Sequence, residues 1–384
     1  MELSLISINA LICIILVLLI LGLIESRIHK LSLNKIPIRI HVNGTRGKSS
    51  VVRLIAAGLR AGGLKTYAKT TGTVPCIINE NGKDINLHRL RTATIGEQIR
   101  LIRFFGKKEP DALVIECMAV NPQYQWISEH KIVKSTLSVI TNVRRDHIDE
   151  MGSTIKDISQ SLSNTIPFNS KVFTSEKLSL KFLKNIASKR NSKIIESENY
   201  DVDLKFLEKM PYIEHKDNVE LALAVCIEAG VRQDKALAGM LKTTPDPGAL
   251  LMWTLKNNLK FISAFAANDP DSTFKVWELI KTKDNYRKCI FLNCRDDRRY
   301  RTIQLIDLVV NRIKPDLFII RGDSIDGELH KHKNKIKIKK FTMKSNQNDV
   351  INYMLELNQF TIVGIGNIVG WGDKFINKLR NYKV

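Results

Sequence analysis

Hydrophobic and polar positions divide the chain into a long apolar start, followed by short apolar runs that alternate with amphipathic stretches. Residues 3–24 are mainly Leu, Ile and Val. A run of this length can cross a bilayer, which takes roughly 20 apolar residues. A cleaved signal peptide needs positive charge before the run and small residues after it, and this sequence has neither. The pattern therefore predicts a single transmembrane helix that anchors the protein.

Basic residues follow the apolar run at once, whereas Glu2 is the only charged side chain before it. Arg27, Lys30 and Lys35 lie just beyond its end. Positive charge beside a membrane span belongs on the cytoplasmic side. We expect a single-pass protein of the inner (cytoplasmic) membrane, with its catalytic domains in the cytoplasm.

The apolar runs after this anchor have the length of buried strands, and the stretches between them have helical periodicity. Such alternation is typical of parallel sheets covered by helices. In the first half, strands are predicted at 38–42, 64–69, 111–116, 137–142, 171–174 and 193–195, with helices after residues 47 and 216. In the second half, strands near 261–265, 289–294, 316–320 and 360–364 alternate with helices near 272–281, 302–312, 349–357 and 371–381.

The segment from Thr243 to Gly248, Thr-Thr-Pro-Asp-Pro-Gly, interrupts this pattern. Pro and Gly in such density favour a turn or linker. We therefore predict an anchor at 1–30, a central domain at 31–245 and a smaller C-terminal domain at 246–384. The expected fold class is α/β, with a parallel-sheet nucleotide-binding domain, a Rossmann-like C-terminal domain and one N-terminal transmembrane helix.

A glycine-rich segment connects the predicted strand 38–42 to the helix after it, and reads Asn43-Gly44-Thr45-Arg46-Gly47-Lys48-Ser49-Ser50. Glycines let a loop curl so that backbone N–H groups face phosphate oxygens, and a helix N-terminus adds partial positive charge. Lys48 would reach the β- and γ-phosphates, and the Ser49 hydroxyl would hold Mg²⁺. The usual P-loop has a glycine where Val42 stands, but the strand and helix supply its context. We predict that these eight residues bind the phosphates of ATP.

Other polar side chains follow the ends of neighbouring predicted strands. Thr70–Thr73 follows one strand, Glu116 ends the next, and 142–149 follows a third. Ligands of open parallel sheets bind beyond these carboxyl ends. Glu116 is a candidate metal ligand, and His147, between Asp146 and Asp149, is a candidate ligand or base. A hydrogen-bonded turn residue is the structural alternative for His147.

Composition adds a strong positive charge, formally +21, and a pI of about 9.7. Such a charge indicates an acidic partner, whether a polyanion, a nucleotide, nucleic acid or anionic lipid. The basic tract 330–340 fits an edge strand blunted by lysines better than a polyanion groove. The six cysteines form no C-x-x-C and no zinc pattern, which favours reduced thiols.

Taken together, these motifs resemble the Mur-ligase superfamily and, within it, the ligase subunit of poly-γ-glutamate synthases, the CapB or PgsB type of capsule biosynthesis. The resemblance runs from the anchor to the last predicted strand. Its matching segments are 43–49, 69–73, 95–98, 116–122 (Glu-Cys-Met-Ala-Val-Asn-Pro), 142–143, 146–149, 151–152, 217–218, 245–249, 266–269, 293–295, 297–298 and 364–368.

The resemblance implies an ATP-dependent amide ligase that extends poly-γ-glutamate through an acyl phosphate. It implies Mg²⁺ ligands at Ser49, Glu116 and His147, and a phosphate clamp at Lys48. Further implied contacts are Thr70 and Thr71 to a second metal or the acyl phosphate, Asn218 to adenine or ribose, and Arg295 and Asp297 to the nucleotide on domain closure.

Four departures from the superfamily pattern bear on the site and on the substrate. Residues 159–163 lack the lysine that many relatives carbamoylate, Ala249 replaces a linker arginine, and Phe265 alters a second-domain motif. The superfamily's sugar-nucleotide domain does not precede the P-loop, so a UDP-linked peptidoglycan precursor is not expected.

The resemblance also implies partners: a multi-spanning membrane subunit, an accessory subunit, and glutamate and polyglutamate as substrates. Homo-oligomers remain possible. Three alternatives stay open: a folylpolyglutamate-like glutamate ligase, a basic ATPase that binds nucleic acid, and an ATP-binding scaffold without chemistry. No aromatic residues interleave the basic tract and no recognition motif for nucleic acid is present, so the nucleic-acid alternative has little support.

Overall fold

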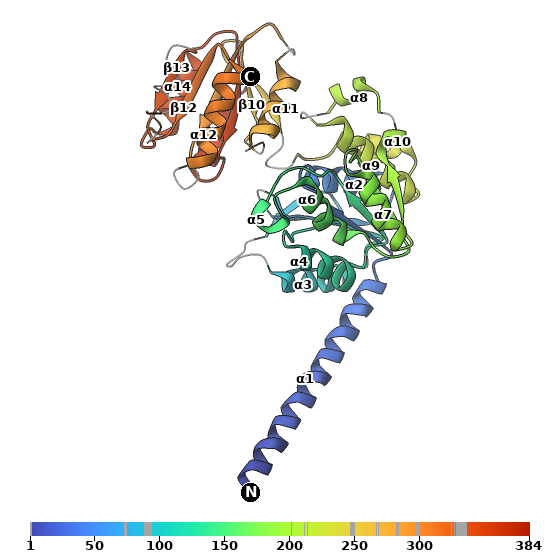
Figure 1. Cartoon of the computed structure of the whole chain (residues 1–384). Coiled ribbons are helices and arrows are strands. Elements are labelled where there is room, and N and C mark those ends of the chain that lie inside the picture. The colour runs from blue at the N-terminus through green and yellow to red at the C-terminus, as the bar shows by residue number, and fades with distance from the viewer. Residues whose placement is uncertain are drawn as a thin grey trace. The chain divides into compact units, whose positions relative to one another are not determined.

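The computed structural model describes the chain except residues 1, 73–74, 88–93, 201, 211, 213, 246–249, 266, 268, 282–283, 296–298, 324, 326 and 328–335. The chain forms two compact units (Figure 1). Unit 1 comprises Met1–Pro211 and His215–Asp246, and unit 2 comprises Tyr212–Glu214 and Pro247–Val384. Each unit has its own sheet and core.

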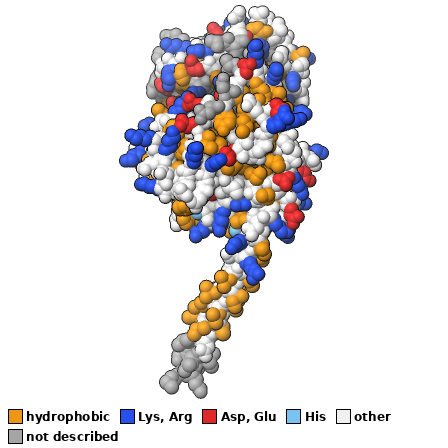
Figure 2. Space-filling view, turned by 90° about the vertical axis from the view of Figure 1, so that its right-hand side faces the viewer, with side chains coloured by type: hydrophobic (Ala, Val, Ile, Leu, Met, Phe, Trp, Pro, Cys, Tyr) orange, Lys and Arg blue, Asp and Glu red, His pale blue; other side chains and the backbone are white. Residues whose placement is uncertain are grey.

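Helix α1 (Glu2–Asn34) contains the predicted anchor and runs on beyond it. Its segment Asn9–Asn34 is long and apolar enough to cross a membrane, with a mean hydropathy of 2.6 in its most apolar window. Figure 2 shows hydrophobic side chains along its outer surface. The last turns are different, because Leu33 is only 5% exposed and the ring of His29 bonds to the carbonyl of Ile132 over 2.8 Å. The C-terminal end of α1 is therefore part of the packing of unit 1.

The sheet of unit 1 has eight strands in the order β4-β3-β2-β5-β1-β6-β7-β8. The strands from β2 to β8 along this order pair in parallel, and β3 and β4 add an antiparallel hairpin beside β2. The bounds are β1 (Ile38–Asn43), β2 (Thr66–Thr70), β3 (Cys76–Ile78), β4 (Asp84–Asn86), β5 (Ala112–Glu116), β6 (Leu137–Ile140), β7 (Lys171–Thr174) and β8 (Lys193–Glu196).

Helices cover both faces of this sheet. On one face lie α2 (Lys48–Ala61), α9 (Lys216–Glu228) and α10 (Gln233–Met240), and Gly239 of α10 fits so closely that an added Cβ would lie 2.4 Å from the carbonyl oxygen of Ala57. On the other face, α3 packs on Tyr67, Leu113 and Ile115. The remaining helices of unit 1 are α3 (Ile95–Gly106), α4 (Pro122–Ile127), α5 (Ile148–Met151), α6 (Ile155–Leu162), α7 (Leu180–Lys189) and α8 (Leu204–Glu208).

The six strands of unit 2 have the order β13-β12-β11-β14-β10-β9, and β9 alone pairs antiparallel among its described strands. Apolar cores fill both faces of this sheet. Its strands are β9 (Leu251–Leu255), β10 (Leu259–Ser263), β11 (Arg287–Asn293), β12 (Leu317–Arg321), β13 (Ile338–Phe341) and β14 (Phe360–Gly366). Its helices are α11 (Pro270–Ile280), α12 (Arg299–Leu308), α14 (Gln347–Leu355) and α15 (Trp371–Leu379).

The α/β fold class predicted from the sequence is confirmed, with two additions. Antiparallel hairpins extend both sheets, β3–β4 in unit 1 and β9–β10 in unit 2. In the basic tract, β13 forms the outer strand of its sheet, in agreement with a lysine-rich edge strand, while residues 330–335 lie outside the described part of the chain. The linker residues 246–249 also lie outside it.

Candidate active site

The loop between β1 and α2 adopts a conformation that requires glycine at two positions. Gly44 and Gly47 have φ angles of +129° and +80°, where side chains with a Cβ are strained. Space is short as well, since a Cβ on Gly44 would lie 2.0 Å from Oγ1 of Thr141, and one on Gly47 would lie 2.8 Å from Oδ1 of Asn218. The glycine pattern of the predicted P-loop is thus explained by backbone conformation and by close neighbours.

The segment after β6 holds this loop in place. Thr45 bonds through Oγ1 to Oδ1 of Asn142 over 2.7 Å, and its N–H donates to the Asn142 carbonyl over 3.0 Å. Oγ1 of Thr141 and Nδ2 of Asn142 both donate to the carbonyl of Arg46, over 2.7 and 3.0 Å. The sequence predicted only that these segments share one edge of the sheet. The structure joins them by hydrogen bonds that hold the loop against the segment after β6.

Two predicted site residues, Ser49 and Thr71, contact a third, Glu116, which is the last residue of β5. Oγ of Ser49 donates to Oε2 of Glu116 over 2.8 Å, and the backbone N–H of Thr71 donates to the same oxygen over 2.7 Å. Glu116 is only 2% exposed. A hydroxyl and a carboxylate are oxygen donors of the kind that Mg²⁺ prefers. Ser49, Thr71 and Glu116 therefore form a compact polar cluster at the carboxyl edge of the sheet.

Lys48 and Asn218 also lie at the loop. Nζ of Lys48 donates to the carbonyls of Gly44 and Thr45, over 2.8 and 3.2 Å, so the ammonium group is held over the loop. Asn218, at the start of α9, faces Gly47 and is 7% exposed. The structure thus brings a residue from far along the chain to the N-terminus of α2.

His147 lies at the rim of the site, and its contacts are separate from those of the Glu116 cluster. Its φ of +44° is left-handed, and its side chain is 55% exposed. Nε2 of His147 is 4.0 Å from Oδ2 of Asp146, which in turn is 3.5 Å from Nη2 of Arg46 in the loop. Within the described residues, no group of three or more His, Cys, Asp and Glu side chains is close enough to hold a metal. His147 is linked to the P-loop through Asp146 and Arg46.

Asn43 and Ser50 complete the predicted loop residues. Nδ2 of Asn43 donates to Gln125 over 2.9 Å and to Thr165 over 3.2 Å, and the side chain is 1% exposed. Asn43 would therefore meet a ligand only through its backbone. Ser50 lies in the first turn of α2 and is partly exposed.

The two predicted site residues of unit 2 are Arg295 and Asp297. Arg295 follows β11, whereas Asp297 lies outside the described part of the chain. Beside the end of β11, Asn293 donates to the carbonyl of Asn367 over 2.6 Å and accepts from Arg321 over 3.0 Å. These residues at the carboxyl ends of β11, β12 and β14 form a second polar edge. No role for Arg321 was predicted from the sequence.

Sequence reasoning also missed two charge pairs in unit 1, of which one is buried on both sides. Lys69 is 0% exposed, and its Nζ lies 3.2 Å from Oε1 of Glu97. His41, in the middle of β1, bonds to Glu129 over 2.7 Å, and both are almost fully buried. Burial by itself lowers the pKa of His41, but Cys117 and Glu129 outweigh it and raise the pKa to about 10. A polar residue inside a predicted central strand is the signal that would have found His41.

The site meets the requirements for a nucleotide phosphate and a divalent metal. Thr141 and Asn218 pack so closely against Gly44 and Gly47 that neither glycine has room for a Cβ, and among the described residues no side chain caps the first turn of α2. A helix N-terminus without a side-chain cap suits an anion. Ser49 and Glu116 offer hard oxygen donors next to it. These residues fit Mg²⁺ and ATP.

Comparison with known proteins agrees with this arrangement. Residues 42–232 match the family described as Mur ligase middle domain, and residues 251–382 match the poly-gamma-glutamate synthase CapB C-terminal domain. The chain is 38% identical over 315 residues to the capsule biosynthesis protein CapB of Bacillus anthracis, covering 80% of this chain and 68% of that protein. It is 34% identical over 383 residues to the PGA synthase CapB of Bacillus subtilis (strain 168), covering 96% of each.

The fold is shared with a solved structure of low sequence identity. FolC of E. coli, in complex with DHPP and ADP, superposes with a TM-score of 0.71 at 15% identity, covering 93% of each chain. At that identity the likeness concerns the fold alone. The identity to the two CapB proteins and the two domain matches carry the assignment. This chain belongs to the CapB group of the Mur ligase family and is an ATP-dependent amide ligase.

Proposed function

We propose that this ligase joins glutamate to a growing poly-γ-glutamate chain for a capsule or a secreted polymer. Support comes from the Ser49–Glu116–Thr71 cluster beside the P-loop, together with the likeness to two CapB proteins over most of the chain. The net charge of +21 suits a polyanionic product.

The proposed reaction proceeds through an acyl phosphate. A carboxylate oxygen of one substrate attacks the γ-phosphorus of ATP and ADP leaves, which gives the carboxylate a good leaving group. The unprotonated amine of the other substrate then attacks the acyl carbon, phosphate departs, the nitrogen loses a proton and an amide remains. Holding the amine and the acyl group together supplies several kcal/mol of the barrier.

Each site residue has a proposed part in this reaction. Lys48 would leave the carbonyls of Gly44 and Thr45 to bind the phosphates, and the loop N–H groups would orient them. Ser49 and Glu116 would hold Mg²⁺, which neutralises phosphate charge when bound. In addition, we propose Thr71 and His147 as metal ligands, Asn218 as a contact to the nucleoside, and Arg295 and Asp297 as nucleotide contacts from unit 2.

We further propose that α1 spans the cytoplasmic membrane and that both units lie on its cytoplasmic side. Support comes from the apolar stretch Asn9–Asn34 and the basic residues Arg27, Lys30 and Lys35 at its inner end. Such a position would place the ligase beside a multi-spanning subunit and an accessory subunit of a polyglutamate synthase. The polymer would then be made at the membrane that it must leave.

The test uses membranes that contain the full chain with its partner subunits. Membranes receive ATP, Mg²⁺ and labelled glutamate, and the products are analysed by mass and by digestion with a γ-glutamyl-specific hydrolase. We expect γ-linked oligomers and phosphate release that depends on glutamate. Lys48→Ala should abolish both while the subunits still assemble. Folate-dependent ADP release without glutamate oligomers, or ATP hydrolysis indifferent to glutamate, would contradict the proposal.

A further inference from the structure

Unit 1 contains a second pocket away from the P-loop. It has a volume of about 330 Å³ and lies between the C-terminal half of α2, the turn of the β3–β4 hairpin and the end of α10. Binding sites for small ligands begin at about 300 Å³, so the space suits a ligand of metabolite size. The polar residues that line it include Arg53, Arg60, Glu80, Lys242, Thr243 and Thr244.

Arg60 is the first sign that the pocket is built for a ligand. Its Nη1 atom is buried, and the described residues offer it no hydrogen-bond partner. Burial lowers the pKa of Arg60 to about 10, with Asp84 opposing this change and Arg53 adding to it. A buried N–H donor without a partner is costly, because it has lost its hydrogen bonds to water and gained none. An anion in the pocket would restore both the hydrogen bonds and the charge balance.

Thr243 gives an independent sign from another element. It lies after the end of α10, is 5% exposed, and its Oγ1 has no partner within the described part of the chain. A buried hydroxyl is normally hydrogen-bonded. Two polar groups from α2 and from the segment after α10 thus line one pocket with unused hydrogen-bonding capacity.

Two other charged residues of the pocket, Arg53 and Glu80, already have partners. Arg53 binds Asp84 through both terminal nitrogens, over 3.0 and 2.9 Å. Glu80 accepts a hydrogen bond from the hydroxyl of Tyr67. Lys242 is exposed at the edge of the pocket and adds positive charge there. The unmet demand in this pocket is therefore for negative charge at Arg60.

This pocket is separate from the candidate active site. Lys48 and Arg60 are 12 residues apart on the same helix, a distance of about 18 Å at 1.5 Å per residue. Thr243 lies three residues before Asp246, where unit 1 ends. A ligand here would thus bind the far end of the P-loop helix and the segment that leads into unit 2.

We propose that this pocket is a second binding site, which takes the oxyanion group of a small ligand through Arg60 and Thr243. The group is a carboxylate or a phosphate, since both offer oxygen acceptors to a guanidinium and a hydroxyl. A carboxylate would come from glutamate or a γ-glutamyl chain, and a phosphate from free inorganic phosphate.

Direct binding tests this site without any measurement of catalysis. The full chain in detergent is first saturated with Mg²⁺ and a non-hydrolysable ATP analogue, so that the P-loop is filled. Equilibrium dialysis then measures binding of labelled inorganic phosphate, glutamate and a γ-linked glutamate trimer, and is repeated in a Lys48→Ala background. We expect saturable binding at one site. Binding of phosphate alone would identify free phosphate as the source of the anion, and binding of the glutamyl compounds alone would identify a glutamyl carboxylate.

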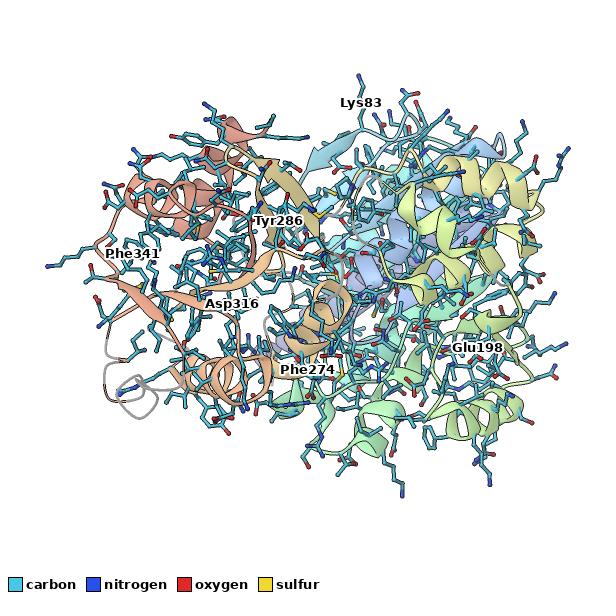
Figure 3. The ribbon with its side chains drawn as sticks, turned by 90° about the horizontal axis from the view of Figure 1, so that it is seen from above. Lys83, Glu198, Phe274, Tyr286, Asp316 and Phe341 are labelled. Atoms are coloured by element: carbon cyan, nitrogen blue, oxygen red, sulfur yellow. The ribbon has the colours of Figure 1, made fainter. Side chains whose placement is uncertain are left out.

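Matched variants assign the binding to the pocket. Arg60→Gln should weaken binding by at least about tenfold, because a charge-assisted hydrogen bond is lost. Thr243→Val removes only a hydroxyl and should weaken binding several-fold, which keeps the test valid if Arg60→Gln fails to fold. The controls are Arg232→Gln, an exposed arginine that precedes α10, and Lys83→Gln, whose side chain points outward from the same hairpin (Figure 3). Both should bind as the unmodified chain does.

Absence of saturable binding for all three probes would overturn the proposal. Equal affinity in Thr243→Val and the unmodified chain would do the same. Either result would leave the proposed ligase reaction untouched, because the P-loop is occupied throughout and no turnover is measured.

Discussion

Ser49, in the first turn of α2, donates its hydroxyl to the carboxylate of Glu116 at the end of β5 over 2.8 Å. The two residues are 67 positions apart in sequence, and they meet because β1 and β5 are parallel neighbours. The pairing places Val42 opposite Glu116, so the strand that leads into the P-loop carries the carboxylate beside it. This relationship defines the polar centre of the proposed metal site.

Glu116→Gln keeps the size of this side chain and removes its charge. We expect turnover to fall by about 100-fold or more, since a metal-bound phosphate transfer loses several kcal/mol of charge stabilisation. Glutamate-dependent ADP release from the full chain measures it, over a range of Mg²⁺ concentrations. Glu109→Gln is the control, because Glu109 is exposed and pairs with Lys35 at the surface. A Glu116→Gln variant as active as this control would exclude Glu116 from the site.

Gly47→Ala should disable the loop through two separate effects. The left-handed φ of +80° strains an alanine by roughly 1–2 kcal/mol, and the new methyl group would press on Asn218 at 2.8 Å. Gly230→Ala isolates the first effect, because Gly230 has φ +89° and open space around it. We expect both variants to unfold at lower temperature, but only Gly47→Ala to lose nucleotide affinity.

A double variant separates the two effects at Gly47. Gly47→Ala combined with Asn218→Ala removes the contact and leaves the backbone strain, so part of the lost stability should return. The measurement is nucleotide titration and thermal unfolding of the unmodified chain, Gly47→Ala, Gly230→Ala and the double variant. If Gly47→Ala binds ATP normally, the left-handed turn at this position has no role in the loop.

The carboxyl-edge site could be predicted from sequence because its residues follow strand ends in a parallel sheet. Strand order brings Glu116 to the P-loop whatever the details of the intervening helices. The inward turn of the Asn43 side chain was beyond such reasoning, since it depends on partners Gln125 and Thr165 from distant segments. The same holds for His41, because Cys117 and Glu129 raise its pKa against the lowering effect of burial, and these partners come from distant segments.

The two antiparallel hairpins show a different limit. Asn257 and Asn258, between β9 and β10, have φ angles of +60° and +52°. Two residues with positive φ are the mark of a tight hairpin turn, and Asn tolerates that region well. The pair was therefore a readable signal, whereas the short β3 depends on tertiary pairing with β2, and the short β4 on pairing with β3.

Truncation should show where the anchor ends and the folded unit begins. Removal of residues 2–24 deletes the exposed apolar part of α1 and keeps Leu33, which is 5% exposed, and the contact of His29 with Ile132. We expect this protein to leave the membrane fraction and to bind ATP normally. Removal of residues 2–34 uncovers the apolar surface under Leu33, at a cost of about 1.5–3 kcal/mol, and should lower the unfolding temperature. Equal stability of the two truncations would show that the end of α1 contributes nothing to unit 1.

The buried pair of His41 and Glu129 should make the stability of unit 1 fall as pH rises above neutrality. The folded pKa of His41, about 10, lies above its ordinary value of 6.5. A group with a raised pKa contributes stability that is complete below its unfolded pKa and is lost as pH rises through its folded pKa. Glu129, whose pKa is lowered by His41 and Ser135 against the effect of burial, keeps its contribution at neutral pH and loses it in acid. Between pH 6.5 and 10, the titration of His41 therefore sets the slope of stability against pH.

Glu129→Gln tests this assignment, because it removes one of the two groups, Cys117 and Glu129, that raise the pKa of His41. The pKa of His41 then falls, and the slope of stability against pH in this range should flatten from a maximum of about 1.4 kcal/mol per pH unit. Glu176→Gln is the matched control. Glu176 is also buried and accepts from the N–H groups of Val143 and Ser179, so its loss should lower stability and leave the slope intact. Stability is measured by urea unfolding from pH 6 to 9.5. Hydrogen exchange of the β1 amides is the readout, so that the measured free energy of unfolding is that of unit 1. The same slope in Glu129→Gln and the unmodified chain would mean that His41 is neutral in the folded protein.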